Sequence, residues 1–373
     1  MRKSLLCLLA VVSAACNDIT DREYPAPEPA PFTSTDADAT GQTRNLLKNL
    51  RALAAEGKTL FGHQSSTLYG IGWTGDANRS DIKSVCGSFP AVIGYDLSGI
   101  ELGNDENIDG DSFNNIRNAI IAAYQRGGIT TLSWHVNNPV SGGDSWDTTP
   151  AVGDIIPGGV LHEKFRGWLD KTADFIKTLR TADGTQIPIL FRPWHEHTGS
   201  GFWWGKGNCT AQDYITLWQF TVEYLRDTKE IHNMLYVYSP DIVNSYDNYL
   251  EFWPGDEYVD IIGLDAYERT GWSLPTEGAR LLRLVKHIAY QKNKPAAFTE
   301  TGLENNKSNP TWWTGNLAAA MNDIPLAYVL VWRNAAENHF FGPYPGCVSE
   351  DDFRAFAQNG RMLFEDDIQN IYK

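Results

Sequence analysis

Eight short apolar runs recur along this 373-residue chain, and they constrain its fold more than any other feature. Most of the runs are continuous rather than alternating in polarity, which is typical of strands covered on both faces in a parallel sheet. The runs are TLFGHQS from Thr59, AVIGYDLSG from Ala91, GITTLSWHV from Gly128, IPILFRPWHE from Ile187, NMLYVYSPD from Asn233, VDIIGLDAY from Val259, KPAAFTETG from Lys294 and LAYVLVWRN from Leu326.

Segments with helical spacing separate these runs. NNIRNAIIAAYQRG, from Asn114, carries apolar residues three and four apart and stops at Gly127, where a helix C-cap is expected. Similar segments begin at Phe165, Ala211, Glu277 and Asp351, the last being DDFRAFAQNGRMLFEDDI. Eight strands that alternate with helices predict an α/β fold of the (β/α)8 TIM-barrel type rather than an open doubly wound sheet.

The first residues have the composition of an export signal. MRK is basic, LLCLLAVV is a short apolar core, and SAAC places small residues before Cys16. The segment 1–16 resembles a bacterial lipoprotein signal lipidated at Cys16, although Ser13 replaces the more usual Leu or Val and leaves ordinary cleavage open. Residues 17–39 are Pro-rich, as a tether would be, so we expect the folded domain to span 40–373. We therefore expect an exported protein, in the periplasm or on the cell surface, that contacts a membrane only through the lipid on Cys16.

The charge of the chain excludes nucleic acid as a partner. Its 31 basic and 46 acidic residues give a net charge of −15, so no basic surface would release the counterions of a phosphate polymer. The chain also contains 13 Trp, 16 Tyr and 16 Phe, which either fill a large core or line a carbohydrate groove.

We expect the protein to be a monomer.

The remaining cysteines predict neither a disulfide framework nor a metal site. Cys86, Cys209 and Cys347 can form at most one bridge, and their spacings fit no zinc motif. Gly-rich fingerprints for dinucleotides or phosphates are absent from the sequence. We therefore expect no cofactor.

Polar residues gather where the predicted strands end. Because the active sites of TIM barrels lie at the carboxyl ends of the strands, these residues are candidates for chemistry. They are His63, Gln64, Asp96, Trp134, His135, His195, Glu196, Asp241, Asp265, Tyr267, Glu300, Trp332 and Arg333.

Two of these residues form a candidate acid–nucleophile pair. Glu196 ends the fourth predicted strand and Glu300 the seventh, so the two carboxyls face each other across the barrel mouth. A retaining glycosidase needs two carboxyls about 5–5.5 Å apart, one protonated and one ionised. Glu196 lies among imidazoles and indoles, which predicts a raised pKa and the acid/base role. Glu300 is then the nucleophile, held ionised by Arg192, Arg333 or a Tyr hydroxyl such as that of Tyr267.

The motifs FRPWHEHTGSGFWWG, SWHVNNP, TETG and VWRN together resemble glycoside hydrolase family 26, chiefly bacterial β-mannanases, from about residue 43 onward. The resemblance implies the same roles for Glu196 and Glu300, and β-1,4-mannosidic linkages of mannans, galactomannans or manno-oligosaccharides as substrate. It further implies that His195 positions the catalytic pair, that His135 and Tyr267 contact the sugar, and that Trp332 stacks under it. Further candidates for substrate binding are Trp203, Trp204, Asp265 and Arg333.

Several alternatives remain open at this stage. Many members of that family carry Trp directly after TGS, where this chain has Gly201, which leaves the mode of cutting open. His195 and His197 of the HEH triplet suggest a metal site, but a third ligand at suitable spacing is not evident. The chain could also be a non-catalytic sugar-binding lipoprotein, with Trp203 and Trp204 partly in the core, or a related hydrolase of β-xylan or mixed-linkage β-glucan.

Overall fold

Eight parallel strands pair edge to edge and close into a barrel. The computed structural model describes residues 34–373, and its strands follow the order β11-β1-β4-β5-β6-β7-β8-β10, with β10 pairing to β11. The barrel strands are β1 Thr59–Gln64, β4 Val92–Asp96, β5 Ile129–Ser133, β6 Ile189–Arg192, β7 Met234–Tyr238, β8 Ile261–Ile262 with β9 Asp265–Glu268, β10 Ala296–Leu303 and β11 Leu326–Val331. Each predicted run supplies one barrel strand, so the predicted (β/α)8 barrel is confirmed.

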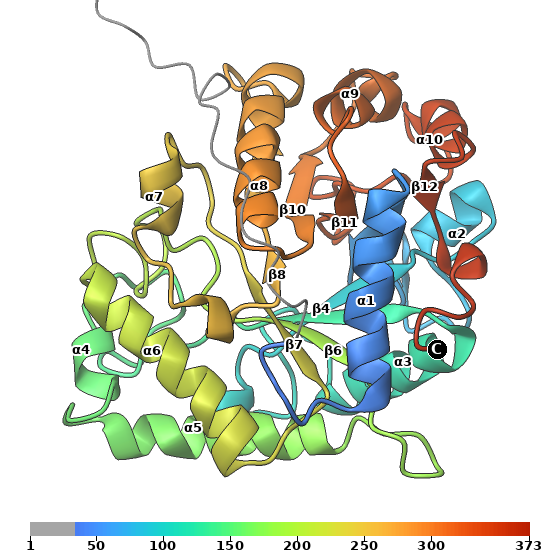
Figure 1. Cartoon of the computed structure of the whole chain (residues 1–373). Helices are drawn as coiled ribbons and strands as arrows, with labels where there is room; N and C mark the ends of the chain where they lie inside the picture. Colours follow the sequence, from blue (N-terminus) through green and yellow to red (C-terminus); the bar gives the residue numbers. More distant parts are fainter. Residues whose placement is uncertain (1–33) are drawn as a thin grey trace, which may run out of the picture.

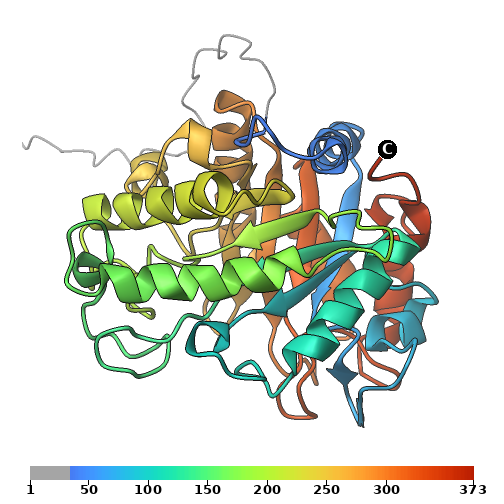
Figure 2. The same ribbon diagram turned by 90° about the horizontal axis from the view of Figure 1, so that it is seen from below.

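Helices surround the strands (Figures 1 and 2). They are α1 Gly41–Ala55, α2 Asp81–Cys86, α3 Phe113–Arg126, α4 Val152–Ile155, α5 His162–Lys177, α6 Ala211–Glu223, α7 Tyr246–Leu250, α8 Ala279–Gln291, α9 Ala318–Ala320 and α10 Glu350–Ala357. Single turns occur at η1 Ile100–Leu102, η2 Tyr224–Thr228, η3 Asp256–Tyr258, η4 Leu274–Gly278, η5 Trp313–Leu317 and η6 Glu365–Asp367, and a small hairpin at β2 Tyr69–Gly70 and β3 Trp73–Thr74. Helix α3 ends at the predicted C-cap, since Gly127 adopts a φ of 99°, and at its start the Ser112 side chain accepts from Asn115 N.

The sixth barrel strand is interrupted, and the interruption places two site residues. Gly263 lies between β8 and β9, and a Cβ at this position would come within 2.6 Å of the Thr299 side chain. Glycine therefore allows β10 to approach closely. Beyond the break, β9 pairs with β10 so that Asp265 is opposite Glu300 and Tyr267 is opposite Gly302.

Helix α1 covers the end of the barrel where the strands begin. Leu46, Leu47 and Leu50 of α1 form one apolar cluster with inward residues of the barrel strands. The C-terminus lies beside α1 in both views (Figures 1 and 2), and Asn49 donates to the carbonyl of Ile371 over 2.8 Å. This end of the barrel is closed by packing, which leaves the opposite end for a site.

The chain termini differ from the sequence-based expectation. The last predicted helix ends at Ala357, because Gly360 turns the chain with a φ of 71° and β12, Met362–Leu363, pairs with β1. At the other terminus, the backbone N–H of Thr35 donates to Asp260 over 2.7 Å and Asp36 is buried. Contacts with the barrel thus begin before residue 40, within the segment predicted as a tether.

The export signal, Cys16 and most of the predicted tether lie outside the described residues, so those predictions remain predictions. Within residues 34–373, no helix combines the length and apolar character needed to cross a membrane. Cys86, Cys209 and Cys347 are all free in this part of the chain.

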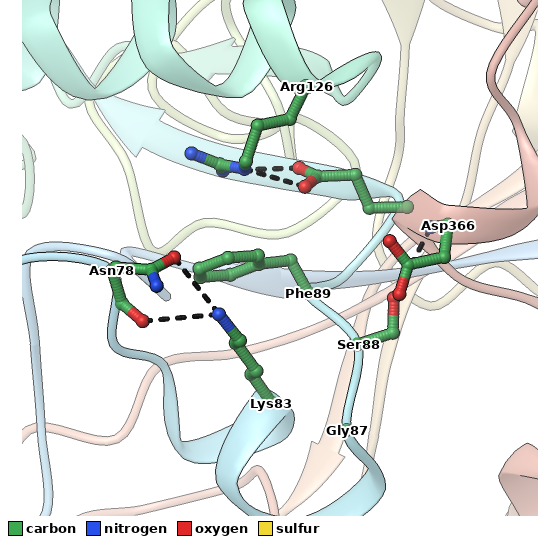
Figure 3. A pocket seen from close by; sticks show the side chains of 8 residues that line it. Asn78, Lys83, Gly87, Ser88, Phe89, Arg126 and Asp366 are labelled. Carbon is green, nitrogen blue, oxygen red and sulfur yellow. Dashed lines mark hydrogen bonds and ion pairs between the residues drawn. The ribbon is translucent and has the colours of Figure 1, made fainter.

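A pocket of about 370 Å³ lies near the starts of β4 and β5, between the end of α2, the end of α3 and η6 (Figure 3). The Phe89 ring lies between Lys83, whose Nζ is 4.3 Å from the ring centroid, and Arg126, whose guanidinium carbon is 4.2 Å from it. Arg126 also binds Glu365 with two nitrogens, at 2.6 and 3.1 Å. These contacts fasten the C-terminal segment to the barrel and leave no free ring face for a sugar.

Candidate active site

The end of β6, the start of β9 and the second half of β10 bring one cation and two carboxylates together. Arg192, the last residue of β6, places Nη1 2.5 Å from Oδ2 of Asp265 and binds Oε2 of Glu300 through Nη2. Tyr267 donates its hydroxyl hydrogen to the other oxygen, Oε1, of Glu300. Glu300 therefore has both carboxylate oxygens bound by donors, which stabilises a negative charge and fixes the direction of the group.

Arg192 and Tyr267 are thus the partners of Glu300, whereas Arg333 is not. The Arg333 guanidinium pairs instead with Asp109, on the loop that follows η1, and lies 3.4 Å from the Tyr69 hydroxyl. Of the three groups predicted to hold Glu300, Arg192 and Tyr267 contact it in the structure. Arg333 joins the loops that follow β1, β4 and β11.

Glu196 occupies an unusual backbone position just after β6. Trp194 and Glu196 have φ values of 52° and 53°, in the left-handed region that non-glycine residues seldom adopt and that clusters at functional sites. The turn is held because Glu196 N donates to Ser239 O over 2.9 Å. The half-buried carboxyl of Glu196 has no hydrogen-bond partner within residues 34–373, which leaves it available to a ligand.

The environment of Glu196 favours a protonated carboxyl. Burial raises its pKa well above that of an ordinary glutamate, and the charges of Glu300 and Asp265 add to the effect. The donors that surround Glu300 have no counterpart at Glu196. The two carboxyls therefore have the opposite environments that an acid and a nucleophile require.

Two imidazoles lie beside this pair. His135 Nδ1 is 2.7 Å from Oδ2 of Asp96, and His135 Nε2 is 3.3 Å from Nε2 of His195. All three side chains are buried. The strand ends thus bring together the predicted residues His135, His195, Glu196, Asp265, Tyr267 and Glu300.

The HEH triplet does not converge on one point. His197 is buried and contacts the hydroxyls of Tyr214 and Tyr238 at 2.9 and 2.8 Å, whereas His195 contacts His135. Burial lowers the pKa of His197 to about 3, so the ring is neutral and serves packing. In the described part of the chain, no group of three or more His, Cys, Asp or Glu side chains could hold a metal ion.

Trp203 and Trp204 are core residues. Both indoles have 0% of their surface exposed, and they donate to the carbonyls of Val136 and His195 over 2.9 and 2.8 Å. Direct contact with a sugar does not fit this burial. Trp204 supports the backbone of the turn that carries Glu196, and Trp203 supports the segment that follows β5, which agrees with the packing alternative for both residues.

Other aromatic rings lie next to His135. Trp332 is half-buried, with its ring centroid 6.3 Å from that of His135, and Trp146 is 50% exposed with its centroid at 5.4 Å. Phe202 lies 5.9 Å from Trp146. Trp146 was missed by the sequence analysis because it belongs to the loop GGDSWDTTP, eleven residues beyond His135, although a lone Trp in so polar a loop was an available signal.

Comparison with known proteins identifies the family. The model of glycosyl hydrolase family 26 matches residues 35–302, well over half of the chain. The chain belongs to glycosyl hydrolase family 26. A solved GH26 β-mannanase from Bacteroides ovatus is 46% identical with a TM-score of 0.86, and the match covers 90% of this chain and 98% of that one. The family 26 endo-β-1,4-mannanase from Cellulomonas fimi gives 37% identity and a TM-score of 0.85, covering 92% of this chain and 80% of that one.

Curated relatives of this family 26 chain are matched over only part of their own length. A mannan endo-1,4-β-mannosidase from Bifidobacterium adolescentis is 34% identical over 88% of the chain, which spans 35% of that protein. One from Bacillus subtilis is 32% identical over 61% of the chain and 61% of its own length. The chain thus spans between about a third and two thirds of these relatives. The family 26 match contains Glu196 and Glu300, whereas Trp332 and Arg333 lie beyond it.

Proposed function

We propose that this chain is a retaining β-mannanase in which Glu196 is the acid/base and Glu300 is the nucleophile. One observation carries the proposal: Glu300 has donors on both carboxylate oxygens, whereas Glu196 has none and its pKa is raised by burial and by neighbouring negative charge. A bare carboxylate and a protonated carboxyl beside one another are what double displacement requires.

The reaction proceeds in two steps. Glu300 attacks the anomeric carbon as the bond from that carbon to the leaving oxygen breaks, and the proton of Glu196 passes to that oxygen. A glycosyl ester on Glu300 results. In the second step Glu196 takes a proton from water, the water oxygen attacks the same carbon, and the bond to Glu300 breaks. That proton restores the protonated form of Glu196, and the product keeps its β configuration.

Mannan is the substrate that the relatives favour. The curated relatives and the solved neighbours from Bacteroides ovatus and Cellulomonas fimi carry mannanase or mannosidase names. Two carboxyls and water suffice for the chemistry, so the proposed reaction needs no cofactor.

A substrate panel tests this proposal. We expect purified protein to release manno-oligosaccharides from β-mannan and galactomannan, at rates well above any release of reducing sugar from xylan or lichenan. Product analysis by chromatography identifies the sugars, and viscosity measured beside reducing ends distinguishes mid-chain from chain-end cleavage. Preferred hydrolysis of xylan or lichenan would contradict the mannan assignment, and binding without hydrolysis would favour a carbohydrate-binding protein.

A matched pair of tryptophan variants separates substrate binding from packing. Trp146→Ala should raise KM for mannan while leaving the melting temperature nearly unchanged, because that ring is half-exposed beside His135. Trp203→Ala should instead destabilise the fold by about 3–5 kcal/mol, the usual cost of removing a fully buried Trp. Thermal melts and steady-state kinetics give both values. A Trp203→Ala variant with normal stability would show that its burial is overstated.

A further inference from the structure

Asp96, the last residue of β4, is a buried carboxylate with an unusually complete set of donors. The backbone N–H groups of Ser98 and His135 donate to Oδ1 over 2.8 and 3.4 Å. The Ser133 hydroxyl donates to Oδ2 over 2.7 Å, and His135 Nδ1 lies 2.7 Å from the same oxygen. The two backbone N–H groups and the hydroxyl all donate, and although burial opposes it, the contacts with His135, Ser133 and Ser98 hold the pKa of Asp96 below its ordinary range, so the group is an ionised acceptor.

This contact fixes the tautomer of His135. The hydrogen bond to Asp96 requires a hydrogen on Nδ1, which leaves Nε2 facing Nε2 of His195 at 3.3 Å. Only one hydrogen can lie between these two nitrogens. Either His135 is an imidazolium that donates to a neutral His195, or a neutral His135 accepts a hydrogen bond from His195.

The charges around the two rings select the first arrangement. Among residues 34–373, His135 is the one basic side chain within ion-pair distance of Asp96, with Nδ1 2.7 Å from Oδ2. Burial alone would lower the pKa of His135, but the charge and hydrogen bond of Asp96 outweigh it and raise the pKa above its ordinary value. Burial, aided by the charges of Arg192 and His135, lowers the pKa of His195 well below its ordinary range.

Other charged groups also act on His135 and Asp96. The charge of Glu300 raises the pKa of His135, and the charge of Arg192 lowers it. The charge of His135 in turn lowers the pKa of Asp109. The charge of Asp96 also raises the pKa of Arg333. The remaining neighbours of the His135 ring are not titratable, namely Trp146, Phe202 and Trp332.

We propose that Asp96 is a positioning residue of the catalytic centre, which aligns the His135 ring and holds an imidazolium charge beside Glu300. The role in catalysis rests on the proposed function, whereas the charge on His135 is a property of the protein alone. A fixed positive charge stabilises the ionised Glu300 before attack. His195 then has its hydrogen on Nδ1, and that buried atom has no hydrogen-bond partner in the described chain.

The direct test is a nitrogen-15 NMR titration of histidine-labelled protein, with the His135 signals assigned from their loss in His135→Asn. In the wild type we expect both ring nitrogens of His135 to be protonated at pH 7, and in Asp96→Asn we expect one of them to be bare. A neutral His135 in the wild type would overturn the proposal. The protonation state is read on the wild-type protein without substrate, and His135→Asn serves only to assign the signals. An unchanged protonation state in Asp96→Asn would overturn it as well.

Kinetics then test the link to catalysis. Asp96→Asn should lower kcat on mannan by roughly 10–100-fold, the size of effect that follows when the carboxylate partner of a metal-binding histidine is removed, with activity partly recovered at lower pH. Asp260→Asn is the matched control, because Asp260 is equally buried and accepts from Thr35 and Tyr236 at the opposite end of the barrel. Unchanged kcat in Asp96→Asn, with an active wild type, would contradict a positioning role. An inactive wild type with a charged His135 would count against the proposed function alone.

Discussion

Glu300→Ala is expected to abolish hydrolysis of mannan almost completely. Removal of a nucleophile eliminates the covalent step, and in other enzymes such changes lower kcat by about 10⁴-fold or more. The variant also leaves the buried guanidinium of Arg192 with one carboxylate partner instead of two. Some loss of stability is therefore expected in addition to the loss of rate.

Two controls separate chemistry from folding in this variant. Glu300→Gln keeps an oxygen that can accept from Tyr267 or Arg192, and it should fold better than Glu300→Ala while remaining as inactive. A small external nucleophile such as azide should enter the space left in Glu300→Ala and form an α-mannosyl azide, because it attacks once with inversion. Substantial hydrolysis of mannan by well-folded Glu300→Ala would remove Glu300 from the mechanism.

Glu196→Ala should show a loss of rate that depends on the leaving group. With mannan, kcat/KM should fall by about 10²–10⁴-fold, the usual contribution of general acid catalysis. With a dinitrophenyl β-mannoside or β-mannobioside, whose leaving group needs no proton, the first step should be nearly unaffected. Rapid release of dinitrophenol followed by slow turnover would be the observable sign, recorded by stopped-flow absorbance.

The pH dependence of Glu196→Ala gives a second readout. Because the pKa of Glu196 is raised, its carboxyl keeps its proton to higher pH than an ordinary glutamate, and wild-type activity should fall as the pH rises through that pKa. The alanine variant lacks this proton, so the alkaline loss caused by Glu196 should be absent from its profile. Equal losses for good and poor leaving groups would argue against the acid/base assignment.

The sequence was sufficient to predict the barrel and to place Glu196 and Glu300 in its carboxyl-terminal half. Continuous apolar runs indicate buried parallel strands, and the carboxyl end of each strand follows directly from where its run stops. Glu196 and Glu300 were therefore placed from local pattern alone. Asp96 was also placed at a strand end, but its contact with His135 depends on how two neighbouring strands align.

Other features depend on long-range geometry that no local pattern contains. Arg192 and Arg333 both follow apolar runs, and only the register of the closed sheet decides which of them reaches Glu300. Trp203 and Trp146 both lie in Gly-containing loops, yet one is buried and the other half-exposed, because burial depends on which segments cover each loop. The helical pattern after Asp351 failed where Gly360 turns the chain toward β1.

The most direct measurement of the central claim is mass spectrometry of protein inactivated with a 2-deoxy-2-fluoro β-mannosyl fluoride, which forms the glycosyl ester but slows its hydrolysis. We predict a stoichiometric adduct of one fluoroglycosyl unit on the peptide that contains Glu300, with inactivation slowed by mannobiose. An adduct on a different residue, or the absence of an adduct together with release of the inverted anomer from substrate, would contradict the account.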